Sequence, residues 1–266
     1  MVGSGSILGN AVRRVEDPGI LRGETRYLDD VPVEGVAHLV FVRSTIAHAR
    51  LESVDTSEAA AMPGVLAAHA AADLGLAPLQ AFVMIPPAMS RPPLAEGVVR
   101  FVGDCVAAVV AETRAQAVDA AELVVVDYDP LPALVDPEAA LADDAPVLFP
   151  EHGSNVAVAF DFGQDPSVLE GADVVVSARI ANQRLAPVPM EANGIVVEPR
   201  PDGGLTVWVT TQNAFAVRDP LAGALGLEPR QVRVIAPAVG GGSGPRWSAT
   251  PSTSSPPRRP GGSDAP

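Results

Sequence analysis

The sequence predicts an α+β fold of mixed α/β type, made of two consecutive units and followed by a disordered tail. Between residues 98 and 128, two apolar runs, a helical pattern and a third apolar run follow one another, which is typical of a compact α/β unit. From residue 194, a second series of apolar runs leads to a glycine run at residues 240–244. A length of 266 residues and an apolar fraction of 47% allow a substantial core and exclude wholesale disorder.

Residues 18–135 form the first predicted unit, behind an N-terminal arm at residues 1–17. Runs rich in β-branched and aromatic residues predict strands, whereas Thr or Ser before a polar-apolar pattern and Pro-Gly after it delimit a helix. The elements expected before residue 98 are a strand at residues 36–42 (VAHLVFV), a short helix capped by Thr56-Ser57-Glu58 and ended by Pro63-Gly64, and a strand at residues 65–68.

The second half of this unit carries the clearest pattern. Apolar runs at residues 98–102 and 106–111 are separated only by Gly103-Asp104, which predicts two strands meeting at a tight connection. Thr113 is a good N-cap for a helix over residues 114–122. Residues 123–128 (LVVVDY) return as a strand that the following Pro residues end.

A connector at residues 136–154, with a short helix starting at Asp136-Pro137, separates the first unit from the second. The second unit, residues 155–244, reads as the beginning of a domain. Its expected elements are strands at residues 174–181, 194–198 and 205–211, a turn at Pro201-Asp202-Gly203-Gly204, a helix at residues 214–225 and a strand at residues 231–236.

Charge and cysteine content exclude several classes of function. The formal net charge of -14 opposes nucleic acid and anionic membrane surfaces as partners. Cys105 is the single cysteine, which excludes an internal disulfide or a cysteine-ligated cluster and indicates a cytoplasmic setting. The first residues lack the features of a signal peptide, and no window reaches the roughly 18 apolar residues of a membrane span.

Two features at the end of the second unit point to a cofactor. A glycine run after a buried strand allows backbone N–H groups to approach an anionic group closely, although an ordinary flexible turn has the same composition. A dinucleotide fingerprint needs glycine where Pro245 stands, and a P-loop needs a Gly-Lys-Ser/Thr ending that is missing. Gln212 is either a strand-end amide that satisfies nearby backbone groups or a neutral hydrogen-bond donor to a bound group.

Several sequence blocks resemble a known family. RGETRYLDDV (residues 22–31) and residues 41–65 and 99–136 resemble the α/β hammerhead domain that opens the molybdopterin-binding large subunit of the xanthine dehydrogenase, aldehyde oxidase and carbon monoxide dehydrogenase family. Residues 182–198, 206–213 (TVWVTTQN) and 232–242 resemble the start of the molybdenum-cofactor domain that follows it. The predicted fold is therefore a hammerhead domain followed by the beginning of a molybdopterin-binding domain.

The resemblance implies a chemistry and a set of site residues. It implies oxidative hydroxylation of a small molecule (an aldehyde, an N-heterocycle or carbon monoxide) with oxygen from water, and a cofactor of the molybdopterin cytosine dinucleotide type. It also implies iron–sulfur and FAD partner subunits. By this resemblance Gln212 reaches the apical oxo group of the molybdenum, and main-chain groups of Gly241, Gly242, Ser243 and Gly244 lie against the metal and the pterin.

The chain also departs from the family. Ser243 stands where the family has phenylalanine, and residues 245–266 contain no Val, Leu or Ile. The glutamate that acts as base in the family lies far downstream of this point, so no catalytic residue and no side-chain metal ligand is assigned. These departures predict a chain truncated or frame-shifted near residue 243, catalytically incomplete and unable to retain the cofactor. The alternative is a non-catalytic α/β module for subunit docking or assembly.

Other polar residues have ordinary interpretations. Met190 and Glu191 are expected to be buried, with Glu191 as a structural carboxylate at a domain contact. Cys105 is expected to be a buried, inert thiol, and His48 a packed or hydrogen-bonded side chain. The four histidines, His38, His48, His69 and His152, do not have the spacing of metal ligands. Asp127 and Asp129 are expected to lie at a solvated strand end.

Overall fold

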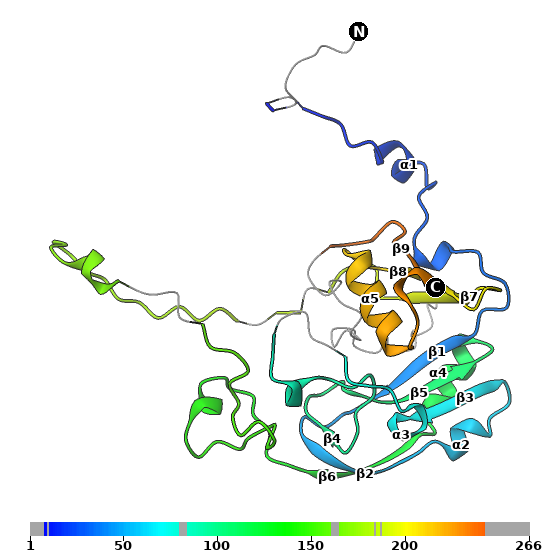
Figure 1. Cartoon of the computed structure of the whole chain (residues 1–266), viewed down its shortest axis with the longest axis horizontal. Helices are drawn as coiled ribbons and strands as arrows, with labels where there is room; N and C mark the ends of the chain where they lie inside the picture. Colours follow the sequence, from blue (N-terminus) through cyan, green and yellow to red (C-terminus); the bar gives the residue numbers. More distant parts are fainter. Residues whose placement is uncertain are drawn as a thin grey trace, which may run out of the picture.

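The computed structural model describes residues 8–9, 11–79, 84–160, 165–183, 185–186 and 188–242. It confirms the mixed α+β class, with three small sheets and short helices (Figure 1). The short elements outside the sheets are α1 (Asp17–Leu21), α2 (Ser57–Ala60), α3 (Ala71–Leu74) and the 3-10 turns η1 (Leu28–Asp30), η2 (Pro87–Met89), η3 (Ala139–Leu141), η4 (Pro166–Leu169) and η5 (Pro229–Gln231).

The first sheet has the order β1-β5-β3 and is antiparallel throughout. Its strands are β1 (His38–Arg43), β5 (Cys105–Ala111) and β3 (Val65–Ala70). The central strand β5 is almost completely buried because it is covered on both faces. Val109 packs against Ala120 of α4 (Arg114–Ala121), whereas Val106, an odd number of residues away, packs against the second sheet. The Thr113 hydroxyl accepts a hydrogen bond from Gln116 N–H (3.2 Å), so the predicted N-cap of α4 is confirmed.

The second sheet has the order β4-β2-β6 and is also antiparallel. Its strands are β4 (Val98–Val99), β2 (Ala49–Asp55) and β6 (Val125–Pro130). The prediction that residues 98–102 and 106–111 meet at a tight connection was wrong, because β4 and β5 belong to different sheets. The backbone around Gly103 and Asp104 instead bonds to Ser44, with Ser44 N to Asp104 O at 2.7 Å and Gly103 N to Ser44 O at 2.7 Å. The backbone of residues 103–104 is therefore bonded to the residue that follows β1 and does not form a β4-β5 hairpin turn.

The third sheet has the order β7-β8-β9 and mixes antiparallel and parallel pairs. A tight turn joins β7 (Ile195–Pro199) to β8 (Leu205–Val209), with the Asp202 carboxylate accepting from Gly204 N–H at 3.0 Å. Strands β8 and β9 (Val232–Ile235) are parallel, which requires a crossover, and α5 (Ala214–Ala224) supplies it. The helix and the sheet share a small core formed by Val207, Ala222 and Val232.

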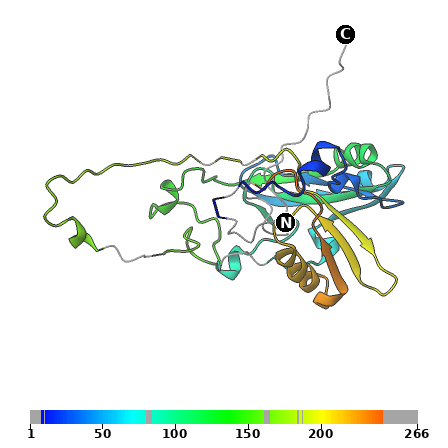
Figure 2. The ribbon, with the colours of Figure 1, turned by 90° about the horizontal axis from the view of Figure 1, so that it is seen from above.

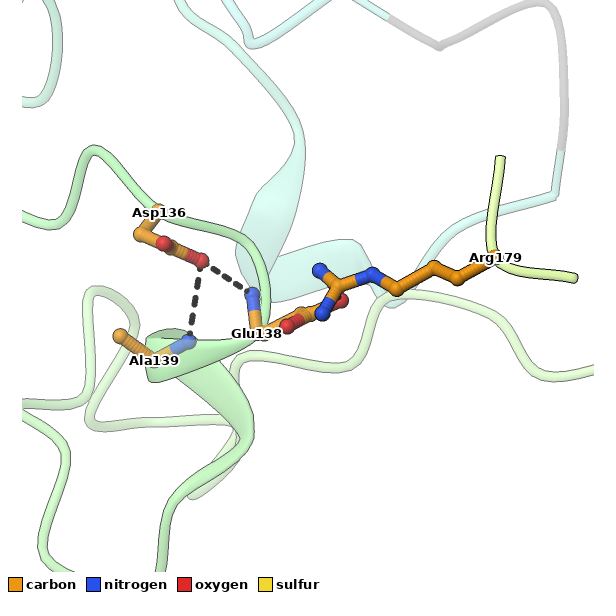
Figure 3. A network of polar contacts seen from close by, with 4 residues as sticks. All are labelled: Asp136, Glu138, Ala139 and Arg179. Carbon is orange, nitrogen blue, oxygen red and sulfur yellow. Dashed lines mark hydrogen bonds and ion pairs between the residues drawn. The ribbon is translucent and has the colours of Figure 1, made fainter. Parts of the chain in front are cut away.

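The described residues between 156 and 190, here called the excursion, leave the body of the molecule and return to it, where Pro189 packs against Gly241 (Figures 1 and 2). The prediction of a strand at residues 174–181 was wrong, since no described segment pairs with it. Val174 and Val176 are 77% and 82% exposed. The excursion touches the connector through an exposed ion pair between Arg179 Nη2 and Glu138 Oε1 (2.6 Å), beside the turn in which Asp136 accepts from the N–H groups of Glu138 and Ala139 (Figure 3). Within the described residues, no helix has the length and apolar content needed to cross a membrane.

Candidate cofactor site

The backbone on both sides of Gln212 is fixed at the carboxyl end of β8. Thr210 is buried and forms a reciprocal pair with Gly194, since its hydroxyl accepts from Gly194 N–H (2.9 Å) and its own N–H donates to Gly194 O (3.1 Å). The Thr211 hydroxyl accepts from Asn213 N–H (3.1 Å), and the Asn213 carboxamide oxygen accepts from Ala216 N–H (3.2 Å) as the N-cap of α5. The strand end and the helix start therefore hold Gln212 between them, while its side chain is exposed.

The glycine run lies next to Gln212. Because β8 and β9 are parallel, the segments that follow them leave the same edge of the sheet. A Cβ atom built on Gly242 would lie 3.4 Å from Nε2 and 3.9 Å from Cδ of Gln212. The structure thus brings together Gln212, Gly241 and Gly242 of the predicted set, whereas Ser243 and Gly244 lie outside the described residues.

Close packing by the segment before β7 explains why glycine is needed here. A Cβ on Gly240 would meet the Glu191 Cβ at 2.6 Å, and a Cβ on Gly241 would meet the Pro189 Cβ at 3.0 Å. Gly241 also has φ +130°, a conformation that side-chain-bearing residues rarely adopt. The run is therefore enclosed on one side by residues 189–191 and borders Gln212 on another.

Glu191 connects this run to the N-terminal part of the chain. Its Oε2 accepts from Gly240 N–H (2.6 Å), its own N–H donates to Gly240 O (3.2 Å), and its Oε1 accepts from Leu28 N–H (3.5 Å). The expected contact of Glu191 between the two units is confirmed by its bond to Leu28, but the expected burial was wrong, because Glu191 is only half-buried. The expected burial of Met190 was wrong, because Pro189 and Glu191 point inward and the side chain between them is fully exposed.

The other singled-out residues lie elsewhere. His48 is buried, with Nδ1 2.7 Å from the carbonyl oxygen of Pro132, and Cys105 is buried in the core with a thiol pKa that burial raises; both interpretations are confirmed. Asp127 and Asp129 are exposed side chains of β6 that accept from Ser53 and Arg50 of the paired strand β2, at 2.7 Å each.

Sequence reasoning missed the role of the stretch around Leu28. Ala238 N–H donates to Arg26 O (3.2 Å), and a Cβ on Gly194 would meet the Leu28 side chain, so this stretch supports both the segment leading to the glycine run and the start of β7. No periodicity could reveal this contact, because the partners are far apart in sequence. Its one sequence signal was that residues 22–31 match the family without forming a strand or an α-helix.

The donor set fits one side of an anionic, oxo-bearing group. The Gln212 carboxamide and the N–H groups of Gly241 and Gly242 donate to no other group in the described part of the chain. An uncharged amide and the backbone N–H groups of two glycines, which carry no side chains of their own, suit such a ligand. Among the residues that the structure describes, no three His, Cys, Asp or Glu side chains gather where they could hold a bare metal ion.

Comparisons with known proteins identify the two units. The sequence model of one protein family, the a/b hammerhead domain of aldehyde oxidase and xanthine dehydrogenase, matches residues 22–132. The sequence model of a second family, the molybdopterin cofactor-binding domain, matches residues 148–255. The nicotine 6-hydroxylase large subunit of Paenarthrobacter nicotinovorans is 36% identical over 253 residues, which is 92% of this chain and 31% of that protein. The carbon monoxide dehydrogenase large chain of Afipia carboxidovorans is 38% identical over 256 residues, which is 89% of this chain and 31% of that protein.

Solved structures agree with this result. Quinoline 2-oxidoreductase from Pseudomonas putida superimposes with a TM-score of 0.78 at 34% identity, over 91% of this chain and 31% of its own. The fold and the matched models therefore define the N-terminal region of a molybdopterin-binding large subunit. The chain belongs to the xanthine dehydrogenase and carbon monoxide dehydrogenase family of these subunits, and it spans about a third of the length of the curated relatives it matches.

Proposed function

We propose that this chain supplies the first part of the cofactor pocket in a molybdenum hydroxylase, an enzyme that oxidatively hydroxylates an aldehyde, an N-heterocycle or carbon monoxide with oxygen from water. The observation that carries the proposal is the position of the Gln212 carboxamide beside Gly242, at the shared carboxyl edge of β8 and β9. The names of three relatives, a nicotine 6-hydroxylase, a quinoline 2-oxidoreductase and a carbon monoxide dehydrogenase, support the N-heterocycle and carbon monoxide classes.

The residues of the site have separate roles in this proposal. A molybdopterin cofactor of the cytosine dinucleotide type would supply the redox chemistry when bound. Gln212 would donate a hydrogen bond from Nε2 without adding charge, and Gly241 and Gly242, which have no side chains of their own, would present backbone N–H groups. Ser243 and Gly244, which lie outside the described residues, complete the set that the family resemblance implies.

We further propose that the 266 residues alone do not turn over substrate and do not retain the cofactor. The support is that the relatives are about three times as long, so about two thirds of each relative's length has no counterpart here. Iron–sulfur and FAD subunits would accept the electrons, in a cytoplasmic setting that the single cysteine favours.

A chimera tests the role of Gln212. Residues 1–242 replace the matching part of the Afipia carboxidovorans carbon monoxide dehydrogenase large chain, and molybdenum, pterin and dye-linked carbon monoxide oxidation are measured. Gln212→Leu is expected to lower activity or molybdenum content by about 10- to 100-fold, as loss of an outer-shell hydrogen bond does. The exposed Gln183→Leu is the matched control. Equal loss in both variants, or none in Gln212→Leu, would contradict the assignment.

The isolated chain provides a second test. It is expected to contain no molybdenum after expression in a host that makes the cofactor. Bound molybdenum together with dye-linked aldehyde oxidation by the 266-residue protein would overturn the proposal of incompleteness.

A non-catalytic docking module is the second candidate, and the exposed apolar side chains of the excursion favour it. Size-exclusion chromatography and pull-down with the iron–sulfur and FAD subunits of a relative would separate the two. A stable complex with normal binding after Gln212→Leu supports docking, whereas a monodisperse monomer that captures neither subunit counts against it.

A further inference from the structure

Three segments that are distant in sequence meet at the Glu191 side chain. The carboxylate accepts from the N–H groups of Gly240 (Oε2, 2.6 Å) and Leu28 (Oε1, 3.5 Å). The N–H of Glu191 donates back to Gly240 O at 3.2 Å, so residues 191 and 240 are joined by two hydrogen bonds in opposite directions. Glu191 is half-buried, and part of this network is therefore shielded from water.

This arrangement compensates for an intrinsic weakness of the glycine run. Consecutive glycines have the largest backbone freedom of any residues, so the run has no preferred conformation of its own. Hydrogen bonds to an ionised carboxylate are roughly twice as strong as neutral ones, and the contact with Gly240 is short. The absence of space for a Cβ at Gly240 shows that the Glu191 backbone and side chain lie directly against the run.

We infer that Glu191 is a positioning residue, which holds Gly240 in place so that the following Gly241 and Gly242 keep their N–H groups beside Gln212. The purpose of the positioned N–H groups rests on the proposed function, but the positioning itself does not. Glu191 does not face the Gln212 side chain in any described contact; it acts through Gly240 and through the stretch around Leu28.

Hydrogen exchange of the complete 266-residue chain tests this inference without any cofactor. Wild type, Glu191→Ala and Glu191→Gln are compared by mass spectrometry of peptides that cover residues 27–31 and 236–242. Glu191→Ala is expected to raise the exchange rate of the Gly240 amide by about tenfold or more, because a hydrogen bond to a charged group is lost. Glu191→Gln keeps one acceptor and should fall between the two. Glu198→Gln, an exposed glutamate on β7, is the matched control and should exchange like wild type.

The pattern of exchange decides the outcome. Faster exchange confined to residues 236–242 and the Leu28 amide supports positioning. Unchanged exchange at Gly240 overturns it, and so does equally faster exchange across β7, β8 and β9, because Glu191 would then be a general support of the sheet. If the chimera binds no cofactor while the local change is seen, the proposed function fails and the positioning role stands. If exchange at Gly240 is unchanged while the chimera needs Gln212, the reverse holds.

Discussion

Among the described residues, Asp104 is the one carboxylate that is buried. Burial raises its pKa, and this effect outweighs the opposing influence of Arg91 and of the Arg100 N–H. The Arg91 guanidinium lies 3.7 Å from Oδ1 and stacks on the Phe101 ring, with its carbon 4.6 Å from the ring centre. Two of its buried nitrogens, Nε and Nη2, make no hydrogen bond, so the pair is poorly compensated.

This raised pKa predicts a definite pH dependence. The folded state keeps the Asp104 proton to a higher pH than the unfolded state, so the free energy of unfolding should fall as pH rises from about 4 through the raised pKa. Below about pH 4 both states are protonated and the group adds no slope. Asp104→Asn removes this titration, and the difference in urea unfolding between wild type and variant should therefore change with pH over this range and level off above it. A difference that is constant from pH 4 to 7, or that favours wild type as pH rises, would contradict the raised pKa.

At the scale of single elements, the N-cap of α5 connects stability to the site. The Asn213 oxygen accepts from Ala216 N–H, and Asn213 directly follows Gln212. Asn213→Ala should lower the free energy of unfolding by about 1 kcal/mol, as loss of a cap usually does. Chemical denaturation measures the change, with the exposed Asn182→Ala as control. If both variants unfold like wild type, the cap contributes nothing and Gln212 is held by other contacts.

Elements with strong local signals could be predicted from the sequence. The apolar run of β5, the Thr113 cap of α4 and the turn between β7 and β8 all depend on neighbouring residues. Strand β2 was missed because its exposed Arg50 and Glu52 weaken the apolar pattern, while its pairing with β4 and β6 is a non-local property. The prediction that residues 98–102 and 106–111 form two strands that meet at a tight connection failed for the same reason, because the sheet to which a strand belongs is also a non-local property.

The candidate cofactor site could likewise be predicted only in part from the sequence. Gln212 and the glycine run were assigned through the family resemblance, and the parallel pair β8 and β9 gives the physical reason why they lie together. The contact between Glu191 and Gly240 could not be predicted, because it spans 49 residues and depends on the path of the backbone before β7. The failed strand at residues 174–181 shows that valine-rich sequence forms a strand only where a partner is available.

At the scale of the whole molecule, packing against the body of the protein does not account for the path of the excursion between residues 156 and 190. Its ion pair with Glu138 is exposed and contributes little to holding it. The quinoline 2-oxidoreductase structure covers 91% of the 266 residues, which leaves about 24 unmatched, fewer than the excursion contains. Part of the excursion is thus matched in a chain about three times longer. Its exposed large apolar side chains are Val156, Val158, Phe160, Val168, Leu169, Val174, Val175, Val176, Ile180, Leu185, Val188 and Met190.

We expect this surface to bind hydrophobic dyes and to cause self-association of the isolated chain, because contiguous exposed apolar groups mark contact surfaces. Val174→Thr combined with Val176→Thr keeps the β-branched shape but removes apolar area, and should lower both the fluorescence of a bound hydrophobic dye and concentration-dependent self-association. The free energy of unfolding should stay the same, since neither side chain belongs to a core cluster. Val102→Thr combined with Val125→Thr is the matched control, as these exposed valines lie on the body. If the control pair lowers dye binding and association as much as the excursion pair, the surface that causes them is not on the excursion.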